Sequence, residues 1–169
     1  TGLPVAGLVG AAGITGYWLV WDKLGQFVAQ ATAEWLDALP IFGEPIARSF
    51  IVAELLSDRM FSLITFIHIA LPLLALLLLW IHLQRVVRPR INPPRGLALG
   101  TFAMLVVLAL LRPAVSQGPA NLAEMPTVVG LDWFYLGLYP LVDRLGQAGA
   151  GLFLGLVAVL LAGLPWLPP

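Results

Sequence analysis

The two histidines of the chain are the residues best suited to redox chemistry, because an imidazole can ligate a heme iron. His68 and His82 are the only histidines, and both lie inside a nearly continuous apolar segment, residues 61–83. Their spacing of 14 residues is close to four helical turns, so both rings point to nearly the same helix face, about 21 Å apart along the axis. Two imidazoles that far apart cannot share one metal ion.

The position of this pair inside an apolar helix favours a functional interpretation. A polar side chain within the hydrocarbon region is costly unless it has a partner. Each histidine suits one axial position of a separate b-type heme, with the two hemes stacked across the membrane. A six-coordinate heme needs a second ligand, and the chain has no third histidine, so the opposing imidazoles would come from another chain or a missing segment. The alternatives are that each ring only hydrogen-bonds a neighbouring helix, or that the pair belongs to a proton relay.

The composition indicates an integral membrane protein. Hydrophobic residues make up 60% of the chain and charged residues 11%, well below the roughly 25% of soluble domains. The formal net charge is zero, which implies no general attraction to nucleic acid. The absence of cysteine excludes disulfides, iron–sulfur ligation by this chain and covalent c-type heme attachment.

The order of apolar and polar segments predicts an all-α membrane protein that forms part of a heme-binding helical bundle. About 20 apolar residues are needed to cross a bilayer, and we expect four transmembrane helices, at residues 3–21, 61–83, 97–111 and 148–164. Residues 22–58 are more polar and contain helix breakers, which favours short amphipathic helices on the membrane surface. Asp143 and Arg144 place residues 133–145 at the interface as well.

The loop charges predict an orientation. Four arginines and no acid lie between the second and third spans, at positions 85, 88, 90 and 95. By the positive-inside rule the Arg85–Arg95 loop is cytoplasmic, and the two long connections share the opposite, positive side. The chain begins at Thr1, without a methionine, which suggests a fragment, a processed product or one piece of a split protein.

Several stretches, taken in chain order, resemble cytochrome b of the bc1 and b6f complexes. GYWLVWD at residues 16–22 resembles the end of the third helix, and LPIFGEP at 39–45 the surface loop after it. His68 to His82, with 13 residues between them, is similar to the fourth helix in its bc1 form. The arginine loop then leads into a segment similar to b6f subunit IV, in which Leu131-Asp132-Trp133-Phe134 stands where the family has Pro-Glu-Trp-Tyr.

The resemblance implies a division of the chain and a set of heme contacts. Residues 1–85 would be the second half of the N-terminal heme-binding bundle, helices C and D, and residues 86–169 the subunit IV-like region, helices E and F. Helices A and B, with the partner histidines on B, would lie elsewhere. His68 would ligate the heme near the positive side and His82 the heme near the cytoplasmic side. Gly2 and Gly16 match glycines that admit the porphyrin planes, although ordinary helix packing through small residues is an alternative.

The resemblance also implies a quinol site. Asp132 falls at the position of the family's glutamate, where a carboxylate accepts a proton as quinol is oxidised, with Trp133 and Phe134 beside it. The alternative is an interfacial acid next to an aromatic belt, which would also explain Tyr17. Arg59 and Arg85 are candidates to pair with heme propionates, although topology alone explains basic residues at these places.

The function implied is that of a cytochrome b subunit in a quinol:cytochrome c (or related acceptor) oxidoreductase of a respiratory chain. The expected partners are a Rieske iron–sulfur protein and a c-type cytochrome, in a dimeric complex of an energy-coupling membrane such as the bacterial inner membrane. Leu63 replaces an arginine of the family, and the ligands of a second quinone site have no clear counterpart. Two rivals remain: a di-heme b anchor of another quinone-linked dehydrogenase or reductase, and a non-redox membrane subunit.

Overall fold

The computed structural model describes residues 2–38, 45–46, 56–87, 92–132 and 136–166. Within these ranges the chain forms five α-helices and no β-strand: α1 (Gly2–Val20), α2 (Lys23–Asp37), α4 (Asp58–Arg85), α5 (Arg95–Leu111) and α6 (Leu138–Gly163), followed by the short 3-10 helix η2 (Leu164–Trp166). The expectation of an all-α membrane protein is confirmed for the described residues.

Three of these helices, α1, α4 and α6, are long and apolar enough to cross a membrane. The third expected span is helix α5, which at 17 residues is about 25 Å long, somewhat less than the ~30 Å hydrocarbon thickness. Gly146 has a positive φ of 71° inside α6 and divides it at a kink. The kink lies between the segment expected at the interface, which carries the exposed Asp143 and Arg144, and the expected fourth span.

The turn from α1 into α2 is set by local backbone and capping chemistry. Trp21 takes a left-handed conformation, with φ 50°, and Asp22 caps α2 by accepting a hydrogen bond from the Gly25 amide, which stabilises a helix start. A Cβ on Gly25 would lie 2.5 Å from the Tyr17 carbonyl oxygen, so only glycine allows α2 to begin this close to the end of α1.

Helix α4 is a single helix of 28 residues that continues through a proline. Ser57 caps its start by accepting from the Met60 amide, and Asp58 and Arg85 lie in its first and last turns, where their charges suit the helix dipole. Pro72 lacks the amide proton that would bond the carbonyl of His68, four residues earlier. The proline therefore loosens the backbone of α4 next to the first histidine.

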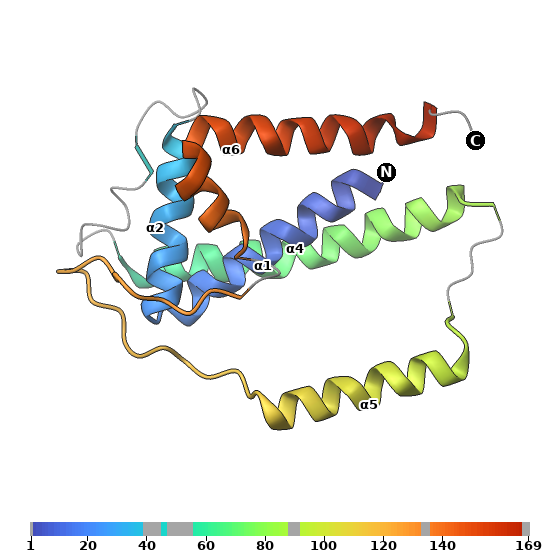
Figure 1. The fold of residues 1–169 in the computed structure, drawn as a ribbon, viewed down its shortest axis with the longest axis horizontal. Coiled ribbons are helices and arrows are strands. Elements are labelled where there is room, and N and C mark those ends of the chain that lie inside the picture. Colours follow the sequence, from blue (N-terminus) through green and yellow to red (C-terminus); the bar gives the residue numbers. More distant parts are fainter. Residues whose placement is uncertain (1, 39–44, 47–55, 88–91, 133–135, 167–169) are drawn as a thin grey trace.

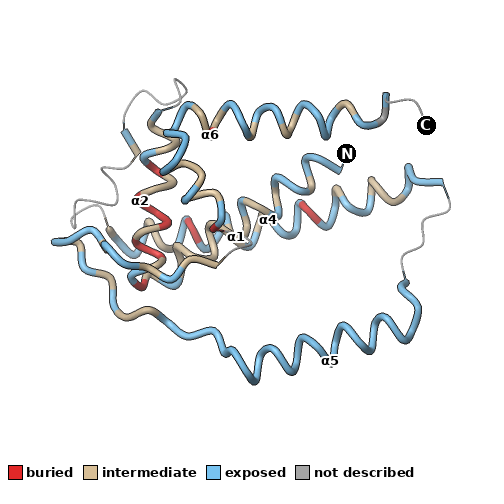
Figure 2. Tube along the Cα trace, viewed as in Figure 1, coloured by how far each residue is buried: buried red, intermediate tan, exposed pale blue. Residues whose placement is uncertain are grey.

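Helices α1 and α4 lie side by side along their length, and α2 runs across one end of this pair (Figure 1). Several of the buried residues lie there, among them Val28, Ala29 and Ala33 of α2. Trp18 and Trp21 pack against Ala29 and Ala33. Helix α5 stands apart and every residue of it is exposed (Figure 2). Apolar surface of this extent must be covered by lipid or by neighbouring subunits.

Candidate functional site

Both histidines of α4 face helix α1, each against a glycine. A Cβ on Gly16 would lie 3.1 Å from Cε1 of His68, and a Cβ on Gly2 would lie 3.6 Å from Cε1 of His82. By contrast, a Cβ on Gly10, from the same glycine-rich helix, would meet nothing within 4 Å. The two glycines singled out from the sequence are therefore the ones that leave room beside the imidazole rings.

The His68 ring is also hydrogen-bonded across the helix pair. Its Nδ1 lies 3.0 Å from Oγ1 of Thr15, and the same hydroxyl lies 2.9 Å from the Ala11 carbonyl and 3.0 Å from the Ala12 carbonyl of its own helix. The ring is half-buried, and Thr15 holds it on the side where Gly16 leaves room for it. Its position is therefore determined by α1 as well as by α4.

An apolar cavity of about 520 Å³ lies between α1 and α4 beside His68. Its walls include Val9 and Gly13 of α1, and Pro72 and Ala75 of α4. A hollow with almost no polar wall apart from one imidazole, lined partly by small residues, fits the edge of a flat apolar macrocycle held through that imidazole. Among the described residues no group of three His, Cys, Asp or Glu side chains could hold a bare metal ion.

Asp132, the candidate proton acceptor, is hydrogen-bonded to the same end of α1 that lies beside His68. The Tyr17 hydroxyl donates a hydrogen bond to its Oδ2, and the Leu136 amide lies 3.4 Å from its Oδ1. Tyr17 directly follows Gly16, which contacts His68. The structure thus brings an acid, a phenol and an imidazole to one end of the α1–α4 pair. Trp133 and Phe134, predicted to flank Asp132, lie outside the described residues.

A set of hydrogen bonds, the polar seam, ties the connection after α5 to the start of α2. The Asp22 carboxylate accepts bonds from the Ser116 hydroxyl at 3.1 Å and the Gln117 amide at 2.9 Å, and the Lys23 amide donates to the Gly118 carbonyl at 2.9 Å. The two long connections therefore meet at the same end of the bundle.

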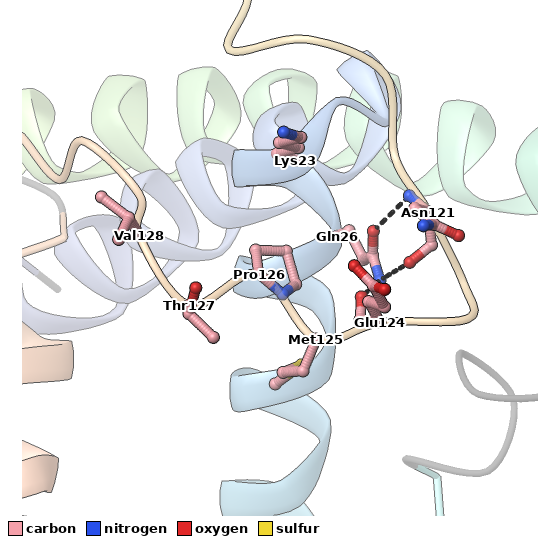
Figure 3. Close-up of a pocket in the computed structure, with 8 residues that line it drawn as sticks. All are labelled: Lys23, Gln26, Asn121, Glu124, Met125, Pro126, Thr127 and Val128. Carbon is pink, nitrogen blue, oxygen red and sulfur yellow. Dashed lines mark hydrogen bonds between the residues drawn. The ribbon is translucent and has the colours of Figure 1, made fainter.

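The buried side chain of Gln26 extends the polar seam (Figure 3). Its Nε2 donates to the Asn121 and Glu124 carbonyls at 2.8 and 3.2 Å, and its Oε1 accepts from the Asn121 amide at 2.8 Å. A cavity of about 500 Å³, lined by Lys23 and Met125 among others, opens beside it. The seam fixes the course of the chain that leads toward Asp132.

The electrostatics of Asp22 strengthen this seam. Burial alone raises the pKa of its carboxyl, but hydrogen bonds from the Gln117 and Gly25 amides and the Ser116 hydroxyl outweigh burial, and the pKa ends below its ordinary value. Bonds donated to a carboxylate stabilise its ionised form. Asp22 is therefore charged at neutral pH and acts as a charged anchor for the connection.

Arg59 and Arg85 are exposed near the two ends of α4. Arg85 follows His82 by three residues and Arg59 precedes His68 by nine. The structure places them at opposite ends of the bundle, outside the helix contacts made by the histidines and glycines. Each lies where a long basic side chain can reach toward the membrane surface.

Two residues of this site were not predicted to contact it from the sequence. The sequence pattern assigns no role to Thr15, and it indicates only an aromatic-belt position for Tyr17. Their position on either side of Gly16 indicates a polar contact at this place, because a hydroxyl in an apolar helix needs a hydrogen-bond partner. Which partner each finds depends on the packing of α1 against α4 and on the course of the distant connection.

These features define a membrane-embedded helical bundle that presents two imidazoles beside glycines and an apolar cavity. The family model for cytochrome b (N-terminal)/b6/petB matches residues 1–99, more than half of the chain, and the chain therefore belongs to the cytochrome b family. It is an integral membrane, heme-binding subunit of a quinol-linked electron-transfer complex, as its resemblance to the family implied. No solved structure matches the chain.

Proposed function

We propose that this chain is the di-heme cytochrome b subunit of a bc-type quinol:cytochrome c (or related acceptor) oxidoreductase, where it passes electrons from quinol across the membrane. The observation that carries the proposal is the paired geometry: His68 lies against Gly16, and His82 lies against Gly2. A helix pair that only packs through small residues has no need to align its two histidines with two glycines at the same spacing.

In this proposal His68 and His82 each supply one axial ligand, and a chain or segment with two further histidines supplies the others. Gly16 and Gly2 keep the backbone of α1 clear of the macrocycles, and Arg59 and Arg85 pair with propionates at the two ends. When bound, the hemes supply one-electron carriers at two depths of the membrane. The residues of this chain hold their positions, their axial ligation and the apolar surroundings.

Quinol binds, in this proposal, beside Asp132, with Trp133 and Phe134 next to it. The Asp132 carboxylate takes up a proton from quinol, and Tyr17 orients the carboxylate through its hydrogen bond. Of the two electrons released by quinol, one would go to a Rieske iron–sulfur protein and from there to a c-type cytochrome, and the other would cross the membrane through this chain. The polar seam fixes the backbone that carries Asp132 at this end of the bundle.

The orientation and organisation follow from the same proposal. The Arg85–Arg95 loop faces the cytoplasm, so the His68 end lies on the positive side of an energy-coupling membrane such as the bacterial inner membrane. Residues 1–85 complete the heme-binding bundle, and residues 86–169 correspond to subunit IV. The assembled complex is a dimer, embedded in lipid through the exposed apolar faces of α4, α5 and α6.

A reduced-minus-oxidised absorption spectrum of the purified complex, with a count of hemes and an inventory of subunits, tests the proposal. We expect b-type bands, two hemes for each copy of this chain, and a co-purifying Rieske protein. Absence of b-type bands would contradict heme binding and favour a non-redox subunit. Two hemes with a flavin or molybdenum dehydrogenase in place of the Rieske protein would show a di-heme anchor of another complex instead.

A further inference from the structure

The hydroxyl of Thr15 has a fixed donor role within its own helix. A threonine hydroxyl carries one proton and two lone pairs. Its oxygen lies 2.9 and 3.0 Å from the carbonyl oxygens of Ala11 and Ala12, which can only accept hydrogen bonds. If the proton pointed elsewhere, the Thr15 oxygen would lie within 3.0 Å of both carbonyl oxygens with no hydrogen bond to either of them. The proton of Thr15 therefore goes to its own helix, as is common for threonine in apolar helices.

This assignment decides the protonation of the facing ring. The Thr15 oxygen lies 3.0 Å from Nδ1 of His68 and has only lone pairs left to offer. A hydrogen bond at that distance then requires Nδ1 to carry the proton, so that the neutral ring keeps its lone pair on Nε2. The hydroxyl thereby selects one of the two tautomers of His68.

The same contact fixes the orientation of the ring. Nδ1 is held by Thr15, which restricts rotation of the imidazole, and the missing side chain of Gly16 lets the adjacent Cε1 come close to α1. The ring borders the apolar cavity between α1 and α4. Nε2 is left as the ligating atom on a ring whose plane α1 determines.

We propose that Thr15 is a positioning residue for the heme ligated by His68, an inference that rests on the proposed function. By accepting a hydrogen bond from Nδ1–H it makes the imidazole a stronger electron donor. A stronger donor favours the oxidised iron, so Thr15 lowers the reduction potential of this heme. It also holds the imidazole plane that determines the electronic structure of the low-spin ferric iron.

The test is a redox titration of the two b-type components in the intact complex, together with the electron paramagnetic resonance spectrum of the ferric hemes. In Thr15→Val, which keeps the shape and removes the hydroxyl, we expect one component to shift upward by up to about tenfold in its equilibrium ratio, or about 59 mV for a one-electron couple, and its resonance to move. Thr15→Ser should titrate as the wild type. Thr65→Val is the matched control, because Thr65 makes the same bond to its own helix, at 2.8 Å to the Phe61 carbonyl.

An unchanged potential and resonance in Thr15→Val would overturn the proposal while leaving the heme assignment intact, whereas a wild-type complex without b-type bands would overturn the proposed function itself. If Thr15→Val binds no heme near His68, Thr15→Ser decides: full heme content at the wild-type potential supports the role of the hydroxyl. Loss of that heme in Thr15→Ser as well would show that only packing matters, and the proposal would be wrong.

Discussion

The two ends of the α1–α4 pair differ in how fully this chain builds the surroundings of each histidine. His68 lies against Thr15 and Gly16. This end of the helix pair adjoins α2 and the polar seam, where many of the buried residues of the bundle lie. His82 lies against Gly2 at the other end, where Leu3 and Arg85 are exposed. The chain thus places a hydroxyl and a glycine against the His68 ring, and a glycine against the His82 ring at an end with more exposed residues.

The largest effects should come from removing the ligands themselves. We expect His68→Leu and His82→Leu each to lose one of the two hemes, because leucine fills the space but offers no lone pair. His68→Leu should also stop quinol oxidation, because its end of the bundle carries Asp132. Heme content per chain, from the pyridine hemochrome, measures this. Full heme content in either variant would show that its histidine only packs against α1.

The second largest effect should come from changes to Asp132 and Tyr17, which test whether proton transfer takes place at the His68 end of the helix pair. Asp132→Asn should slow quinol oxidation by about 100-fold, the lower range for the loss of a general base, with heme content unchanged. Tyr17→Phe should slow it less, because it removes one hydrogen bond to the carboxylate and leaves the carboxylate in place. Steady-state quinol oxidation measures both rates.

The control for this pair is Asp143→Asn, which alters an exposed acid on α6 and should leave the rate unchanged. Full activity in Asp132→Asn would show that the carboxylate is only an interfacial acid. An equal loss in Asp143→Asn would show that the rate responds to surface charge rather than to the Tyr17–Asp132 pair.

A smaller effect is expected from adding a methyl group at each of the two glycines that face a histidine. Gly16→Ala places a methyl group 3.1 Å from the His68 ring, and Gly2→Ala places one 3.6 Å from the His82 ring. We expect a lowered heme content or a shifted heme potential in Gly16→Ala, and a weaker effect in Gly2→Ala. Gly10→Ala is the matched control, because nothing lies within 4 Å of its added Cβ.

Alanine strengthens a helix relative to glycine by up to about 1 kcal/mol, so helix weakening cannot explain a loss of heme in these variants. Equal behaviour of Gly16→Ala and Gly10→Ala would remove the argument that Gly16 makes room beside the imidazole.

The smallest effect concerns the polar seam. Because the pKa of Asp22 is lowered in the folded chain, its stabilising contribution is present at neutral pH and is lost as pH falls below about 4, through the folded value. The protection of the Gln117 and Gly25 amides from hydrogen exchange, relative to their intrinsic rates, should therefore fall in acid. Asp22→Asn should exchange faster already at neutral pH and lose this pH dependence. Exchange in the wild type that shows no response beyond the intrinsic effect of acid would contradict the anchoring role.

The sequence was sufficient for features that depend on length and periodicity. Runs of apolar residues and 3.6 residues per turn predict three of the four expected spans, the amphipathic α2, and the shared face of His68 and His82. The remaining expected span, α5, is a shorter apolar helix. The break at Gly146, between an interfacial segment and a span, could be inferred from the charges at Asp143 and Arg144. Each of these features is a property of one segment.

Contacts between distant segments could not be predicted in the same way. Tyr17 and Asp132 are 115 residues apart, and Asp22 and Gln117 are 95 apart, so their pairing depends on how the connection after α5 folds back. Thr15 is an ordinary helical threonine until α4 is packed beside it. The resemblance to a family identified the glycines but carried no information about these hydroxyl groups.

The most direct test of the account is an experimental structure of the assembled complex that locates iron relative to Nε2 of His68 and of His82. We expect two separate heme irons, one bonded to each of these nitrogens, with a histidine from another chain or segment on the far side of each porphyrin. An imidazole turned toward the acyl chains, or no porphyrin within bonding distance of either ring, would contradict it.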